Sequence, residues 1–160
     1  MGVGLRKQRF RLGLECLHGV GAGSKAGRGF LEPGERHECV GDVRATYARR
    51  PDGRIDVVNR CRTAGGETEA RGVARIVDEQ AFARLKVRFA PAWLSFLPVW
   101  GDYWIIGLAD DYTWAVVGSP DRKYLWILAR TPRLDAAAFE RAVAAARVNG
   151  FDSGLLIVAR

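Results

Sequence analysis

Short segments that alternate between apolar and polar residues dominate the middle of the sequence and constrain its fold most strongly. Residues 43–47, 55–62 and 84–89 each change character at every second position. A strand points successive side chains to opposite faces, so this period is typical of a strand with one buried face. Several such strands close together predict an antiparallel sheet with one apolar side.

The first two alternating segments predict a hairpin with a defined register. Residues 50–53 read Arg-Pro-Asp-Gly, a tight-turn composition in which glycine supplies the positive φ that closes the loop. The register that this turn favours sets Tyr47 opposite Val57 and Ala45 opposite Asn59. All four side chains then lie on one face, so the turn and the polarity agree.

Further strands follow with short connections. We expect them at residues 69–77, 103–108, 112–117 and 124–130, with a last short strand at 155–158. Consecutive antiparallel strands with one apolar face remove their exposed edges by closing on themselves. The fold class predicted is therefore all-β with one helix, arranged as an up-and-down antiparallel barrel.

The pattern changes to a helical period after the last long strand. Asp135 is a suitable N-cap for a helix that runs to about Val148, and Asn149-Gly150 provides its stop. One stripe of this helix is apolar (Phe139, Val143 and Ala146). We expect that stripe to pack outside the barrel, against Leu125, Ile127 and Ala129.

Residues 1–38 differ from the rest of the chain. Glycines and cations are scattered there without a period, and neither the strand nor the helix template fits. We interpret 1–38 as an anomalous Gly/Arg-rich segment that is disordered or read out of frame, and 39–160 as the folded domain.

Composition limits the classes of partner. The chain has 160 residues and a formal net charge of +7, which raises nucleic acid as a partner. The cations are spread along the chain, however, and a nucleic-acid site needs them on one face, so we expect no nucleic acid. No apolar run reaches the length of a membrane span, and no signal peptide or lipobox is recognisable.

The barrel interior is the predicted binding site. Ala70, Gly72 and Ala74 fall on the inward face and leave space there. Asn59 is a single polar group on that face, suited either to anchoring a ligand head group or to bonding internal water or backbone. Aromatic residues expected to line the space, or else simply to pack the core, are Tyr47, Phe89, Tyr112, Trp114 and Trp126.

Catalytic chemistry has little support. His18 and His37 lie in or beside the anomalous segment, and no spacing of Cys, His, Asp or Glu resembles a metal site. Cys61 is open to three interpretations: a nucleophile, a small buried apolar residue, or half of a disulfide. Pairing with Cys39 requires a bulge or a bent strand end, because the predicted register separates the two. We expect no catalytic residue, metal or cofactor.

Several pieces of the sequence resemble the lipocalin family, in particular bacterial outer-membrane lipocalins and apolipoprotein D. They are residues 43–47, 51–53, 57–59, 103–110, 112–118, 120–132 and 149–152, so the resemblance covers about 39–160. It implies an eight-stranded calyx that binds, stores or transports fatty acids, lysophospholipids or similar lipids without catalysis. It also implies an outer-membrane or periplasmic location, a monomer or dimer, and contact with membrane lipids.

The resemblance also assigns structural residues. Asp121 and Tyr124 match the family's second motif, and Arg130 matches its third. In the family that arginine packs over a tryptophan of a first Gly-x-Trp motif, which this chain does not carry before residue 39. We therefore expect the first strand to be missing or replaced, with residues 12–14 or 37–38 as substitutes.

Two other functions remain as alternatives. One is an enzyme of the same fold that uses Cys61 on a lipid-like substrate. The other is a basic barrel that binds nucleic acid, whose affinity would fall steeply with salt.

Overall fold

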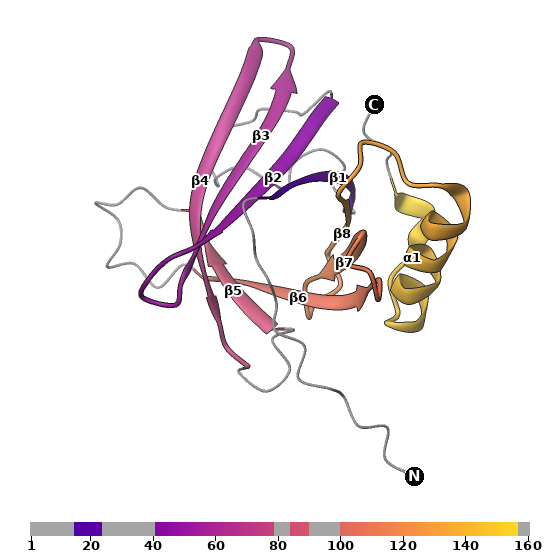
Figure 1. The fold of residues 1–160 in the computed structure, drawn as a ribbon. Coiled ribbons are helices and arrows are strands. Elements are labelled where there is room, and N and C mark those ends of the chain that lie inside the picture. The colour runs from indigo at the N-terminus through magenta and orange to yellow at the C-terminus, as the bar shows by residue number, and fades with distance from the viewer. Residues whose placement is uncertain (1–14, 24–40, 79–83, 90–99, 157–160) are drawn as a thin grey trace.

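A computed structural model describes residues 15–23, 41–78, 84–89 and 100–156 of the chain. Within these ranges eight antiparallel strands close into a barrel in which each strand pairs with its neighbours in chain order (Figure 1). The predicted fold class is confirmed. The strands are β1 (Glu15–Gly23), β2 (Gly41–Arg49), β3 (Ile55–Thr63), β4 (Gly66–Ile76), β5 (Arg84–Arg88), β6 (Gly101–Leu108), β7 (Trp114–Gly118) and β8 (Tyr124–Ala129).

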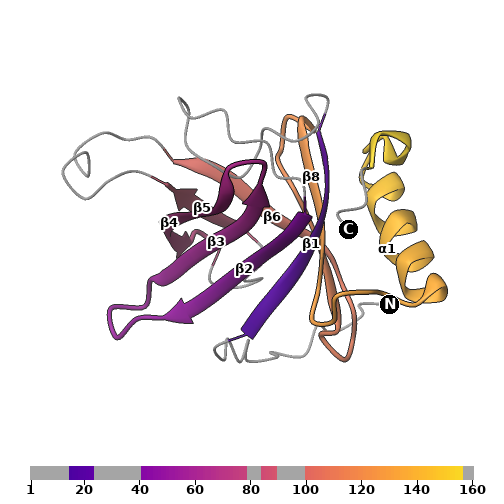
Figure 2. The same cartoon turned by 90° about the horizontal axis from the view of Figure 1, so that it is seen from above.

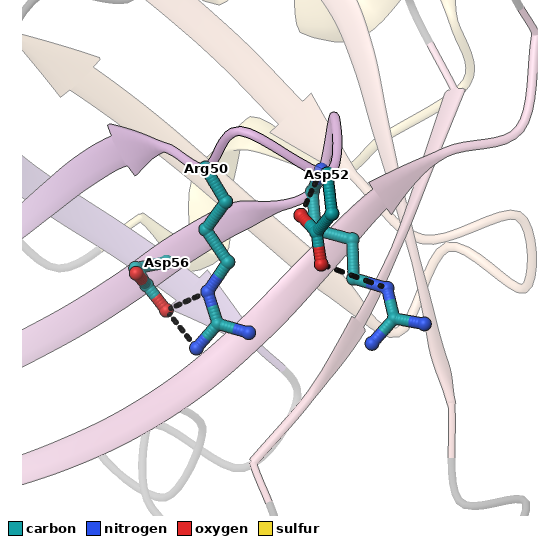
Figure 3. A network of polar contacts seen from close by, with 4 residues as sticks. Arg50, Asp52 and Asp56 are labelled. Carbon is teal, nitrogen blue, oxygen red and sulfur yellow. Dashed lines mark hydrogen bonds and ion pairs between the residues drawn. The ribbon is translucent and has the colours of Figure 1, made fainter.

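The β2–β3 hairpin has the register predicted from its turn. Tyr47 lies opposite Val57 and Ala45 opposite Asn59. Gly53 has a φ of 81°, the left-handed conformation that glycine adopts without strain. Figure 3 shows the Arg50 side chain directed toward Asp56 on β3, and its Nε lies 2.7 Å from the carboxylate. The turn chemistry therefore fixes which face of both strands points inward.

The first strand comes from residues 1–38, the segment that we expected to be disordered apart from a substitute strand at 12–14 or 37–38. β1 pairs with β2 through Glu15–His18 and with β8 through His18–Gly23, so one strand joins both edges of the sheet. Figure 2 shows it between β2 and β8. The expectation of disorder is wrong for residues 15–23, because a strand can be held by backbone hydrogen bonds to two neighbours without a side-chain pattern. The substitutes that we predicted, 12–14 and 37–38, lie outside the described residues.

One helix, α1 (Ala136–Val148), packs outside the barrel against β6 and β7. Its predicted cap is confirmed, because the Asp135 carboxylate accepts a hydrogen bond from the Ala138 amide at 2.8 Å. The helix ends at Asn149, followed by Gly150 with a φ of 80°. Its apolar side meets outward residues of β7 and β8 in one buried cluster: Trp114, Val116, Leu125, Ile127, Ala138, Ala142, Val143, Ala146 and Phe151.

The end of the chain differs from the prediction of a last strand at 155–158. Residues 153–155 form a short 3-10 helix, η2 (Ser153–Leu155), and residues 157–160 lie outside the described part. The Asp152 carboxylate accepts a hydrogen bond from the Gly154 amide at 2.9 Å, which favours a turn rather than an extended chain. As for membrane crossing, no helix in the described ranges has the length and apolar character required.

Candidate binding site in the barrel interior

A second apolar cluster fills part of the barrel interior. Its buried members come from β3, β4 and β5, and aromatic residues of β2 and β6 pack against it. The members are Ile55, Val57, Ala74, Leu85 and Val87, with Tyr47, Ile76, Phe89, Tyr103 and Ile105 partly buried around them. The inward face that the alternation predicted is thus the apolar one.

Asn59 is the polar exception on this face. It is 2% exposed, and neither its side-chain nitrogen nor its side-chain oxygen has a hydrogen-bond partner among the described residues. Its neighbours on the adjacent strands are Ala45 and Ala70, both too small to reach it with a polar atom. An unsatisfied buried polar group costs about 1–3 kcal/mol. The side-chain nitrogen and oxygen of Asn59 can therefore form hydrogen bonds with a bound ligand.

Two tyrosines meet across the interior. The hydroxyl oxygens of Tyr47 on β2 and Tyr103 on β6 are 2.7 Å apart, in hydrogen-bonding contact. Burial raises the pKa of Tyr47 to about 12, although the bond to Tyr103 opposes this shift. Burial raises the pKa of Tyr103 as well. Both phenols are therefore neutral at physiological pH, and together they place two hydroxyl groups inside an apolar wall.

A stack of aromatic rings leads outward from this pair. Trp126 stacks on Tyr103 with 6.1 Å between ring centroids and on Tyr124 with 5.8 Å. Tyr124 is 44% exposed, so the stack runs from the surface to the hydroxyl pair. The predicted inward position of Trp126 agrees with these contacts. Sequence reasoning missed Tyr103, because residues 103–108 are apolar on both faces and their period indicates no inward side.

Gly72 does not leave the space that we predicted for it. A Cβ atom there would lie 2.7 Å from the ring of Phe89 and equally close to the Arg88 carbonyl oxygen. The aromatic ring occupies the place of the missing side chain. Phe89 is thus held against β4 and packs on the interior cluster.

Two predicted lining residues lie elsewhere. Trp114 is opposite Ala129 in the β7–β8 register and belongs to the buried cluster beneath α1, so its assignment to the interior is wrong. The physical reason is that the helix makes the outer face of β7 as apolar as the inner one. Tyr112 lies before β7, in the turn after β6, with a φ of 61°. Its expected place within a strand is therefore also wrong.

The residues assigned to family motifs sit at two turns. The Asp121 carboxylate accepts hydrogen bonds from the Ser119 hydroxyl at 2.6 Å and from the Lys123 amide at 3.2 Å, which organises the β7–β8 turn. The Ser119 hydroxyl and the Lys123 amide hold the pKa of that carboxyl below its usual range. Arg130 donates from Nε to the Tyr112 carbonyl oxygen at 2.7 Å, which joins the end of β8 to the β6–β7 turn.

Cys61 is buried on the inward face and is disulfide-bonded. A sulfur in a disulfide is no thiolate, so the enzyme alternative built on Cys61 as a nucleophile loses its reactive group. The pairing with Cys39 stays a prediction, because Cys39 lies outside the described residues. In the part of the chain that the structure describes, no group of three or more His, Cys, Asp or Glu residues could hold a metal ion.

Charged side chains of the central strands point away from the interior. The Arg75 and Arg88 guanidinium groups lie over the Trp100 ring, at 4.6 and 5.0 Å from its centroid. Lys86 pairs with Asp102 at 3.1 Å. These partners keep the cations on the outer face, so the barrel separates a charged outside from an apolar inside.

Solved structures share this architecture. Lobster apocrustacyanin A1 superimposes with a TM-score of 0.64 at 12% identity, over 91% of this chain and 76% of that one. The cockroach allergen Per a 4 superimposes with a TM-score of 0.62 at 12% identity, over 98% and 90%. At such identities the likeness concerns the fold alone. It places the chain in the class of eight-stranded barrels with an external helix.

Sequence comparison carries the assignment further. The family model described as a lipocalin-like domain matches residues 33–160. Temperature-induced lipocalin-1 of Arabidopsis thaliana is 40% identical over 113 residues, which are 69% of this chain and 61% of that protein. The outer membrane lipoprotein Blc of Citrobacter freundii is 38% identical over 117 residues, 72% of this chain and 63% of that protein. The chain thus spans under two thirds of these relatives.

The chain belongs to the lipocalin family, whose members bind small hydrophobic ligands. Members of the family are generally binding and transport proteins rather than enzymes. The resemblance stated from the sequence is confirmed.

Proposed function

We propose that this protein binds a fatty acid, a lysophospholipid or a similar lipid inside its barrel, for storage or transport and without catalysis. The observation that carries the proposal is Asn59, a buried carboxamide without a described partner on an otherwise apolar face. Binding sites for small apolar molecules combine such a wall with a few polar groups that fix orientation. A lipid supplies both an apolar chain and a polar group for the carboxamide.

The aromatic stack gives the ligand its path. Tyr124 is exposed at the start of β8, Trp126 follows it inward, and Tyr103 ends the stack at the hydroxyl pair. An acyl chain lying along these rings would bury apolar surface at about 25 cal/mol per Å². The ligand-binding residues that we retain are therefore Tyr47, Asn59, Phe89 and Trp126, with Tyr103 and Tyr124 added.

Location and assembly are part of the same proposal. The relatives named Blc are outer membrane lipoproteins, and by analogy we place this chain at the outer membrane or in the periplasm, near membrane lipids. We expect a monomer or a dimer that binds no nucleic acid.

We also keep the hypothesis that the Gly/Arg-rich residues before 39 derive from another reading frame. Sequencing the coding region tests it, and absence of a Gly-x-Trp motif in every frame would contradict it.

Titration of the purified protein with a fatty acid tests the binding. We expect quenching of tryptophan fluorescence at micromolar ligand, because Trp126 lies in the proposed path. Native mass spectrometry of the same sample reports a retained lipid and the oligomeric state. Unchanged emission together with the absence of any retained lipid would contradict the proposal.

A further inference from the structure

Resting on the lipid-binding function proposed above, we infer that the barrel interior selects ligands whose polar group is uncharged and discriminates against the isosteric carboxylate. Among lipids this favours amides and alcohols, whose head groups can enter the interior. An ionised fatty acid would have to leave its head group in water.

The first observation concerns the hydrogen-bonding groups of Asn59. The Asn59 carboxamide offers one acceptor and one donor group, carries no charge, and is 2% exposed. A ligand whose polar group both donates and accepts hydrogen bonds can satisfy the nitrogen and the oxygen of this carboxamide. A carboxylate only accepts, so it leaves the Asn59 oxygen unsatisfied.

The second observation is the distribution of charge over the two faces of the strands. Among the described side chains within the strand bounds, the buried and half-buried positions of the inward face carry no charge. Arg49 shares that face by its register with Ile55, but it is exposed at the end of β2. Arg130 is half-buried and follows β8 in the same alternation as Trp126, but it lies beyond the end of the strand and donates from Nε to the Tyr112 carbonyl oxygen. The hydroxyl groups of Tyr47 and Tyr103, which meet inside the barrel, belong to neutral phenols.

The cations of the same strands are on the other face, where acids or tryptophan rings engage them. Arg60 binds Glu69, Lys86 binds Asp102, and Arg75 covers Trp100. None of these three can turn inward without crossing the sheet. A carboxylate in the interior would therefore be desolvated without a described counter-charge, which costs far more free energy than burying a neutral amide of the same shape.

The test compares two ligands that differ in charge alone. Lauramide and laurate have the same chain and isosteric head groups, and at pH 8 only laurate is ionised. Each ligand is titrated, at concentrations below its own critical micelle concentration, against wild-type protein that carries the neutral fluorescent probe N-phenylnaphthylamine. Displacement of the probe reports binding of the ligand. We expect lauramide to bind at least about tenfold more tightly than laurate. Equal or tighter binding of laurate would overturn the inference and leave the proposed function standing.

A variant tests whether Asn59 causes the preference for lauramide over laurate. Asn59→Leu keeps the volume and removes both polar atoms, so we expect it to weaken lauramide about tenfold and to change laurate little. Unchanged probe binding shows that the variant is folded. A variant that binds the probe and keeps the full preference for lauramide would overturn the role of Asn59. If wild type binds neither ligand nor the probe, the proposed lipid-binding function itself is wrong.

Discussion

The hydroxyl groups of Tyr47 and Tyr103 touch at 2.7 Å although their strands, β2 and β6, are separated by three strands in either direction around the barrel. The bond therefore crosses the interior instead of following the wall. A ligand that entered the interior as proposed would meet this pair of hydroxyl groups.

This pair makes stability sensitive to alkali. The pKa of Tyr47 is raised to about 12 by burial, above the ordinary value of 10, so the folded state holds its proton longer than the unfolded state. Its stabilising contribution is complete below pH 10 and is lost as the pH rises to about 12. Urea unfolding at several pH values measures this loss. Tyr47→Phe should flatten the dependence, and an equally steep loss in that variant would contradict the assignment.

The two tryptophans assigned at first to the interior should respond differently to ligand. Trp126 lies in the aromatic stack, whereas Trp114 is 7% exposed beneath the helix. Trp126→Phe should abolish most of the fluorescence change on lipid titration, and Trp114→Phe should preserve it. The two replacements are chemically matched, so each serves as the control for the other. A response that disappears with Trp114 would place the ligand outside the barrel.

The Phe151 ring lies so close to Gly118 that a side chain at position 118 should destabilise the fold. A Cβ atom at Gly118 would collide with the Phe151 ring, which is buried in the cluster under α1. We expect Gly118→Ala to lower the free energy of unfolding by about 1–3 kcal/mol, as overpacking does. Gly101→Ala is the matched control, since its Cβ would meet its nearest neighbour at an ordinary 3.7 Å. Adding Phe151→Leu should recover part of the loss.

The Asp121 carboxylate organises the β7–β8 turn, and its removal should destabilise the barrel by about 1 kcal/mol, the value of a hydrogen bond. Its pKa is lowered in the folded state, so its contribution is present above pH 3.8 and is lost as the pH falls through the lowered pKa. Thermal unfolding of Asp121→Ala at neutral pH measures the effect. Asp110→Ala, an exposed acid in the other turn, is the control, and equal losses in both would contradict the role.

Strand periodicity made most of the barrel predictable. The register of Tyr47 against Val57 followed from one turn and one alternation, because a half-buried strand encodes its inward face directly. Trp114 was misassigned because α1 makes the outer face of β7 apolar too, which erases the alternation. The inward side of β6 was hidden for the same reason, and its register shifts between Ile105 and Gly107. No local pattern could show that Tyr47 and Tyr103 meet, since their contact depends on barrel closure.

The pairing of β1 with both neighbours has a consequence for the order of folding. The β2–β3 and β3–β4 hairpins join residues close in sequence, whereas β1 meets β8 across more than a hundred positions, as with His18 and Ala129. Contacts so distant along the chain form slowly, because the loss of chain entropy precedes any gain from pairing. Closure by β1 is therefore expected to be a late kinetic event. Until it occurs, β2 and β8 are open edges, and the time they spend unpaired sets how long a newly made chain is exposed to self-association.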